Sequence, residues 1–137
     1  MNSRLDILRV SPGELTDRQL LLLRDIVKAS YYQDDLGDVV RAIVEGQKQL
    51  WRITGPKAVD WIILVTVVQC AKWKELWIWG LAGTGYIKTG DEVYPHIARA
   101  NGCKTIGGMT KSEGLMRLYR QRKNITEYKT FLWEIVS

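Results

Sequence analysis

Apolar positions in the first third of the chain repeat with the period of an α-helix. Between residues 17 and 30 they share one face, which predicts a first helix, and the spacing over residues 36–44 predicts a second that ends at Gly46. A Ser or Thr followed three residues later by Glu or Gln forms a candidate capping box at Ser11 and again at Thr16. The pattern therefore predicts two successive amphipathic helices with a capped entry.

The apolar pattern then changes to one typical of strands. Three runs rich in β-branched and aromatic residues occupy residues 48–54, 58–68 and 75–81, and a shorter run at residues 5–10 precedes the helices. The middle run is apolar almost throughout, as expected for a central strand that is covered on both faces. A buried helix has the same pattern, so periodicity alone leaves that alternative open.

The C-terminal part alternates between the two periods. The sequence "GDEVYPHIARANG" predicts a helix that begins near Asp91, because Pro95 is tolerated only near a helix start, and that ends before Gly102. A strand, a helix that opens on a capping box at Thr110, and a closing strand at residues 125–136 follow. The predicted order is β-α-α-β-β-β-α-β-α-β, an α/β fold whose mixed sheet is flanked by helices.

Length and composition narrow the class of protein. The 137 residues and the net charge of +5 fit a single domain over residues 1–137 that permits an anionic partner without demanding one. The longest apolar run is broken by Asp60 and Gln69, and the N-terminus lacks a signal-peptide pattern, so we expect a protein that is neither membrane-bound nor secreted. Cys70 and Cys103 form no disulfide framework and no metal site, and we expect Cys103 to be a buried, inert thiol.

Basic residues are spread along the chain except in the run "RLYRQRK", residues 117–123. Such a run could contact a coenzyme phosphate or a nucleic-acid backbone. A solvated helix face is the simpler interpretation, so a nucleic-acid partner is not expected.

A glycine-rich stretch, "LWIWGLAGTGYIKTG", includes and follows the third strand-like run. The first and last glycines of "GLAGTG" have the spacing of a P-loop, but Tyr86 and Ile87 replace the lysine and the hydroxyl residue that such a loop needs. The dinucleotide fingerprint fails because Lys88 stands in place of its third glycine. An acyl-coenzyme A loop, R/Q-x-x-G-x-G/A, matches except at Gly80, where Arg or Gln is expected.

The order of elements around these glycines resembles the GCN5-related N-acetyltransferase (GNAT) superfamily. The segments "ELWIWGLAGTG", "HIARANG", "CKTIGGMT", "GLMRLY" and "KTFLWEIV" follow that family's order, most clearly over residues 48–136. The resemblance implies a GNAT-like fold, with acetyl-coenzyme A as cofactor if the chain is active. Gly80 departs from the family because it carries no side chain. The predicted helix also starts several residues after Gly85, and Asp91 and Glu92 near its start would repel a pyrophosphate.

The resemblance also implies roles for individual residues. Backbone N–H groups of Gly83, Thr84 and Gly85 would hold the coenzyme pyrophosphate. Tyr119, in the family's "LY" position, would protonate the departing thiolate. The alternative for Tyr119 is a packing residue on an amphipathic helix.

A general base is implied as well, since members of the family commonly use a carboxylate to deprotonate the amine. Glu75 lies at the start of the strand that leads to the glycines, and Asp60 interrupts the preceding apolar run, where an unpaired carboxylate would be costly. An ordinary surface charge is the alternative for both residues.

Two tryptophans of the same strand have a separate interpretation. Trp77 and Trp79 alternate along it and therefore share a face. Core packing is the simpler explanation. Because one face of this strand lies near the acyl-chain cleft in the family, the two indoles could instead fill that cleft.

A narrower resemblance concerns residues 96–121, which look like GNAT-like proteins of tailed bacteriophages, some of them internal virion proteins. It favours a phage-type protein of the virion or host cytoplasm, with phage structural proteins as partners and a degenerate acyl-coenzyme A site. The alternative is an active N-acetyltransferase that moves an acetyl group from acetyl-coenzyme A to an amine. Both functions, and the oligomeric state, stay open at this point.

Overall fold

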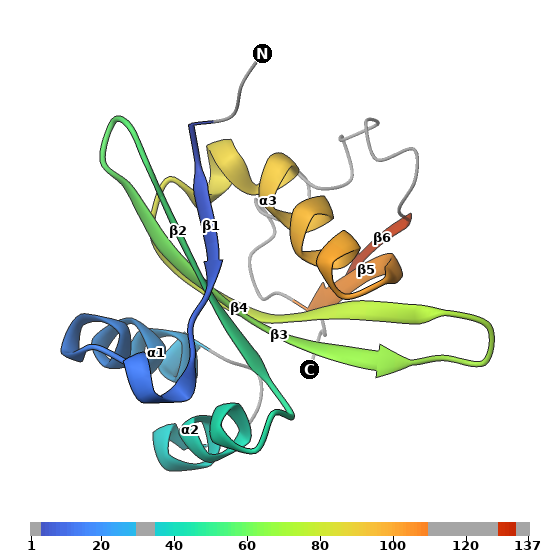
Figure 1. Ribbon diagram of the computed structural model, residues 1–137, viewed down its shortest axis with the longest axis horizontal. Coiled ribbons are helices and arrows are strands. Elements are labelled where there is room, and N and C mark those ends of the chain that lie inside the picture. Colours follow the sequence, from blue (N-terminus) through green and yellow to red (C-terminus); the bar gives the residue numbers. More distant parts are fainter. Residues whose placement is uncertain (1–3, 30–34, 110–128, 134–137) are drawn as a thin grey trace.

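The chain folds into a six-stranded sheet with helices on both faces, seen in a computed structural model that describes residues 4–29, 35–109 and 129–133. In chain order the elements are β1 (Asp6–Arg9), the 3-10 helix η1 (Pro12–Glu14), α1 (Asp17–Ala29), α2 (Leu36–Val44), β2 (Gln49–Gly55), β3 (Val59–Gln69), β4 (Lys74–Thr84), α3 (Tyr86–Ala100), β5 (Cys103–Met109) and β6 (Lys129–Trp133). Figure 1 shows α1 and α2 on one side of the sheet and α3 on the other. The helix predicted to open at Thr110 lies outside the described residues.

Within the described residues the strands lie in the sheet in the same order as in the sequence, from β1 to β6. Neighbours from β1 to β4 are antiparallel, whereas β4, β5 and β6 are parallel. Tight turns join β2 to β3 and β3 to β4, but the parallel step from β4 to β5 needs a crossover, which α3 supplies. This topology confirms the predicted mixed sheet, and the described elements follow the predicted order.

Two hydrophobic cores lie on opposite faces of this sheet, and β3 contributes to both. Trp61 and Ile63 pack with residues of α3, whereas Ile62 and Leu64 pack with residues of α1 and α2. All four side chains are at most 1% exposed. Burying one side chain of this size contributes about 1.5–3 kcal/mol. The continuous apolar run is therefore a central strand covered on both faces, and the alternative of a buried helix is wrong.

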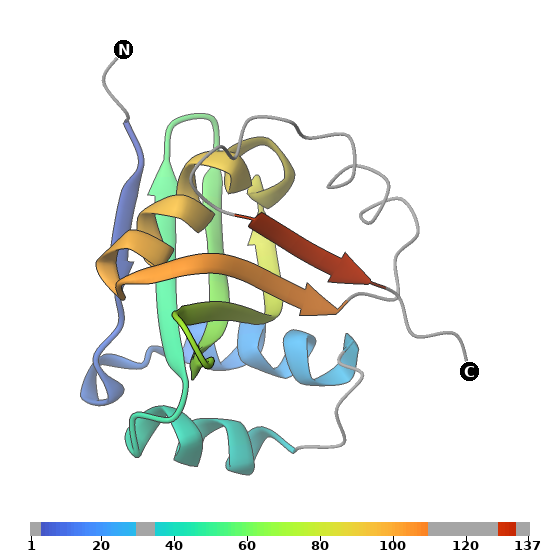
Figure 2. The same ribbon diagram turned by 90° about the vertical axis from the view of Figure 1, so that its right-hand side faces the viewer.

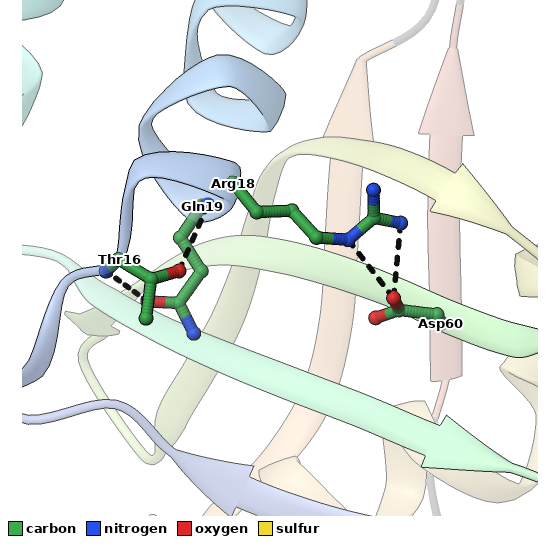
Figure 3. Close-up of polar contacts among 4 residues, drawn as sticks. All are labelled: Thr16, Arg18, Gln19 and Asp60. Atoms are coloured by element: carbon green, nitrogen blue, oxygen red, sulfur yellow. Dashed lines mark hydrogen bonds and ion pairs between the residues drawn. The ribbon is translucent and has the colours of Figure 1, made fainter.

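One of the two capping boxes predicted before α1 forms. The backbone N–H of Thr16 donates to Gln19 Oε1 at 2.9 Å, and the Gln19 N–H donates to Thr16 Oγ1 at 3.2 Å (Figure 3). The box predicted at Ser11 is wrong, because the Ser11 hydroxyl makes no cap bond to η1. A box that the sequence rule missed opens α2, where Asp35 and Asp38 cap each other, since Asp stands in the place usually given to Glu or Gln.

Helix α3 begins at Tyr86, so its predicted start near Asp91 is wrong. Gly85 adopts the left-handed conformation, with φ of +98°, and turns the chain directly from β4 into the helix. Its carbonyl accepts hydrogen bonds from the Thr89 N–H at 3.2 Å and from Thr89 Oγ1 at 2.7 Å. These two hydrogen bonds connect Thr89 to Gly85 and so stabilise the first turn of α3.

Two residues that argue against a helix lie inside α3, Gly90 and Pro95. Gly90 has a packing role, because a Cβ there would lie 2.9 Å from ring atoms of the buried Tyr94. Pro95 removes the hydrogen bond that its own N–H would donate. The helix continues past it because Tyr94, Ile97 and other apolar side chains of the same face are buried against the sheet.

Strand β4 contains a bulge at Trp79. On β3 the neighbouring residues Leu64 and Val65 pair with Gly80 and Ile78, which leaves Trp79 as the extra residue of β4. Parallel pairing of β4 with β5 covers only the part before the bulge and ends at Ile78. Within the described chain, no strand pairs with that edge of β4 beyond the bulge. Figure 2 shows β5 and β6 slanting away from the direction of β2 and β3.

Candidate functional site

The glycine-rich turn lies where β4 ends and α3 begins. Thr84 is the last residue of β4, and Gly85 is the N-cap of α3, where it offers no side chain to the helix. The first N–H groups of an α-helix have no partner within the helix, and its dipole places partial positive charge there. The first turn of α3 holds no acidic residue and includes the exposed Lys88. This turn has the backbone geometry and the charge of an anion-binding site.

Asp91 and Glu92 do not oppose that charge as the sequence suggested. Both lie in the second turn of α3, because the helix starts at Tyr86. Because the helix starts earlier than predicted, these two carboxylates are not in its first turn, and the predicted repulsion of a pyrophosphate there no longer applies.

Gly83 is required by the packing of the sheet itself. Its φ is +122°, and a Cβ there would lie 2.4 Å from the Asp60 carbonyl oxygen and 2.6 Å from Trp61 Cα on β3. No side chain fits between the two strands at this point. The sequence suggested that Gly83 lets a pyrophosphate approach the backbone closely. In the structure it is the backbone of β3 that approaches Gly83 closely.

A chain of hydrogen bonds holds the turn to the sheet. Trp61 Nε1 donates to Thr89 Oγ1 at 3.0 Å, and that hydroxyl donates to the Gly85 carbonyl at 2.7 Å. The Trp61 ring is fully buried and meets the rings of Tyr86 and Tyr94 edge-on, with centroids 6.1 and 6.3 Å away. The start of α3 is therefore fixed before any ligand arrives.

Position 80, where the acyl-coenzyme A pattern has Arg or Gln, has room only for glycine because α1 packs closely against β4 there. A Cβ on Gly80 would lie 2.4 Å from Ile26 Cγ2, which belongs to the side of α1 that packs on the sheet. Arg or Gln at this position would displace the helix. The glycine follows from the closeness of α1 to β4, whatever the chain binds.

Asp60, one of two candidate bases, is engaged by a residue that the sequence did not connect with it. Arg18 Nε and Nη2 both lie 2.9 Å from Asp60 Oδ2 (Figure 3). The pair borders a cleft of about 110 Å³ between the start of α1 and the sheet. Asp60 also pairs with Thr84, so it lies at the glycine end of β4, where its carboxylate is held by a cation instead of facing an acceptor amine.

Glu75, the other candidate base, lies at the opposite end of β4. Its half-buried side chain lies 3.3 Å from the place where a Cβ on Gly107 would be, and Trp77 shares that space. The bulge at Trp79 lies four positions, about 13 Å, along β4 from Glu75, and Gly83 lies eight positions, about 26 Å, from it. The structure therefore does not bring Glu75 together with the glycine turn.

Tyr119, the candidate general acid, and the basic run at residues 117–123 lie outside the described residues. Their roles stay predictions from the sequence resemblance.

Trp77 and Trp79 share one face of β4, as predicted, and it is the face that α1 and α2 cover. Glu75 and Trp77 alternate with Leu76 and Ile78 of the α3 core, and Trp79 packs against the other core. Neither indole is fully buried. Sequence reasoning missed the third member of this group, Lys48, whose Nζ lies 3.7 Å from the centroid of the Trp79 ring.

In the described part of the chain, no three His, Cys, Asp or Glu side chains are close enough to hold a metal ion. None of the described helices has the length and apolar character needed to cross a membrane. His96, the one histidine, is exposed, and its ring meets that of Trp51 edge-on at 6.3 Å.

Cys103 is buried, as the sequence predicted, and burial raises the pKa of its thiol above the ordinary value despite the opposing charge of Lys74. We expect an alkylating reagent at pH 8 to modify the half-buried Cys70 and to spare Cys103 in the folded protein. Peptide mass mapping measures this, with unfolding in urea as the control in which both thiols react. Rapid alkylation of native Cys70→Ser protein at Cys103 would contradict it.

The same shift has a consequence for stability. The folded protein favours the neutral form of the Cys103 thiol. The contribution of this thiol to the free energy of unfolding is therefore complete below the unfolded-state pKa of about 8.5, and it is lost as pH rises through the higher folded-state pKa. Cys103→Ala should therefore remove part of the decline in the free energy of unfolding that we expect above that pH.

No protein-family model matches the sequence, and no curated protein matches it either. Solved structures do match in three dimensions. They include two aminoglycoside acetyltransferases from uncultured soil metagenomic samples, one with active-site density assigned to polyethylene glycol and one in complex with sisomicin. The first has a TM-score of 0.58 and 16% identity over 88% of this chain and 93% of its own. The second has a TM-score of 0.61 and 12% identity over 98% and 93%.

An integron cassette protein from the mobile metagenome of V. cholerae matches as well, with a TM-score of 0.53 and 13% identity over 92% of this chain and 90% of that one. At such low identities the likeness shows the fold alone. It confirms the predicted acetyltransferase-like α/β fold.

Proposed function

We propose that the chain binds acyl-coenzyme A at the turn between β4 and α3 and transfers the acetyl group to an amine. The observation that carries the proposal is the direct entry of the glycine turn into α3, with Lys88 and no carboxylate in the first helical turn. This arrangement suits the pyrophosphate of the coenzyme. The acetyltransferase-like fold supports the same assignment.

The edge of β4 offers a path for the rest of the coenzyme. Gly83 lies four positions, about 13 Å of strand, after the bulge at Trp79, and no described strand lies on the β5 side of this part of β4. An extended arm with two amide groups, as in pantetheine, can pair with such an edge as an added strand does. The thioester would then lie at the bulge.

At the bulge an amine can attack the thioester carbonyl. A C–N bond forms, the C–S bond breaks, and the thiolate of the coenzyme takes up a proton. Glu75, the one carboxylate of β4, lies about 13 Å along the strand from this point, so as the base it would have to act through a chain of several waters. Tyr119 remains the proposed acid from the sequence resemblance. Two of the similar structures are aminoglycoside acetyltransferases, which favours an amine as acceptor.

A virion or assembly protein with a degenerate coenzyme site is the second candidate, in the virion or host cytoplasm and with phage structural proteins as partners. It rests on the resemblance of residues 96–121, of which only 96–109 are described. Two observations that suggested a degenerate coenzyme site have a different explanation in the structure. The late helix start is wrong, and Gly80 has a packing reason. Coenzyme binding without acetyl transfer to any amine would favour this candidate.

Acetyl-coenzyme A is expected to raise the thermal stability of the protein, by about 2.7 kcal/mol at one hundred times its dissociation constant. Lys88→Glu should weaken binding about tenfold, or ~1.4 kcal/mol, because it replaces a cation beside the pyrophosphate with an anion. A carboxylate in the first turn stabilises a helix, so this variant should remain folded. Thermal shift and calorimetric titration measure both effects.

The matched control is Lys72→Glu, which makes the same change of charge on an exposed residue of the turn between β3 and β4. It should bind like the unmodified protein. An unchanged melting temperature at millimolar acetyl-coenzyme A would refute the proposed function.

A further inference from the structure

A lysine amine lies over the ring of Trp79, the bulge residue of β4 at which the thioester is proposed to lie. Lys48 Nζ is 3.7 Å from the centroid of the Trp79 ring, and Trp79 is the bulge residue at which β4 and β5 stop pairing. Both side chains are half-buried. A cation over an indole face is held there by the negative charge of the ring.

The backbone on both sides of Lys48 is fixed. Its N–H donates to the Ala42 carbonyl at the end of α2 at 3.1 Å, and the next residue, Gln49, begins β2. Gln49 pairs with Val65, which in turn pairs with Ile78 beside the bulge. The lysine therefore starts two strands away from β4 at the level of the bulge, and its long side chain reaches Trp79.

We infer that Lys48 is itself an acetylation site of the protein, modified from the coenzyme bound on the same chain. The inference rests on the proposed function, since it needs the thioester at the bulge. The inference is supported by the position of the Lys48 amine over Trp79. Trp79 orients an amine on the α1/α2 face of β4, and the coenzyme arm would lie along the neighbouring edge, where no described strand pairs with β4.

The chemistry balances without any further reagent. Lys48 first loses a proton to become a neutral amine. Its lone pair attacks the thioester carbonyl, the C–N bond forms and the C–S bond breaks. The coenzyme leaves as a thiolate that takes up a proton, and the amide keeps one hydrogen on nitrogen. The net products are an acetamide on Lys48, free coenzyme A and one released proton.

Acetylation would change this part of the sheet. It removes the positive charge and with it the cation–π contact with Trp79. A neutral acetamide then occupies the α1/α2 face beside the bulge.

The test is incubation of the full chain with acetyl-coenzyme A, followed by peptide mass spectrometry over time. Lys48 should be acetylated at least about tenfold faster than the exposed Lys57 and Lys72. The rate constant should not depend on protein concentration, because donor and acceptor share one chain. Acetyl phosphate, which lacks the coenzyme, should show no preference for Lys48, and Lys88→Glu at subsaturating coenzyme should slow the reaction about tenfold.

Lys48→Arg keeps a cation near Trp79 and should show the same thermal shift with acetyl-coenzyme A but no modification at residue 48. Acetylation of Lys48 no faster than of Lys57, in protein that the coenzyme clearly stabilises, would overturn this inference alone. Absence of stabilisation by the coenzyme would overturn the proposed function, and the inference with it. Equal Lys48 acetylation in the Lys88→Glu variant would show solution chemistry and would also overturn it.

Discussion

Gly83→Ala is expected to lower the free energy of unfolding by about 4 kcal/mol. The positive φ of +122° is strained for any residue with a side chain, at about 1–3 kcal/mol. The new Cβ would also press on Asp60 and Trp61 of β3 at 2.4 and 2.6 Å, and overpacking of this kind costs about 1–3 kcal/mol. Because the atoms in contact are backbone, no side-chain rotation relieves the clash.

Urea denaturation measures this loss as a lower midpoint with an unchanged slope. Gly102→Ala separates the cost of the positive φ from the cost of the clash with β3. Gly102 also has a positive φ, +68°, but no atom lies within 4 Å of its Cβ position. Its cost should be only about 1–2 kcal/mol. Equal losses for the two variants would mean that the contact with β3 contributes nothing. Large substitutions at Gly83 are therefore poor probes of coenzyme binding, since they damage the sheet first.

Gly80 and Ile26 are expected to behave as one energetic unit. Gly80→Ala should cost about 2 kcal/mol, because its Cβ would lie 2.4 Å from Ile26 Cγ2. Ile26→Ala should cost about 3 kcal/mol through the lost burial and the cavity. The double variant should be little worse than Ile26→Ala alone, because the space that Cγ2 filled now accepts the new methyl group. The coupling is thus about 2 kcal/mol.

A double-mutant cycle in urea measures that coupling. Ile26→Val is the matched control, since valine keeps both γ-carbons and loses only the terminal methyl. Combined with Gly80→Ala it should give no rescue. Additive losses in the Ile26→Ala cycle would show that α1 can move aside, and the packing explanation for Gly80 would then be lost.

The strands and the first two helices could be predicted because their signals are local. Alternation of apolar residues identifies a strand whatever its partner is, and the Thr16–Gln19 box depends on residues three apart. The start of α3 depends on distant residues. Gly90 and Pro95 each disfavour a helix locally, by about 1 and 3 kcal/mol. Contacts of Thr89 with Trp61 and of the α3 face with the sheet outweigh them.

The candidate site divides in the same way. The glycines and their place between a strand and a helix could be read from the sequence. The engagement of Asp60 by Arg18 could not, because 42 residues separate them. The bulge at Trp79 and the lysine above it follow from strand register, which depends on pairing between strands and not on the composition of either.

The order of the strands has a consequence for how the protein forms during synthesis. β2, β3 and β4 are joined by turns of a few residues, so their pairing closes short loops at little cost in chain entropy. β5 can join the sheet only after the 15 residues of α3 have been made and have crossed back. The emerging chain is therefore expected to build the antiparallel half first, with the free edge of β4 exposed to the ribosome exit and to chaperones. The proposed coenzyme-binding turn would be completed with the start of α3, before β5 and β6 join the sheet, so we expect a chain that ends before Tyr86 to carry no affinity for acyl-coenzyme A.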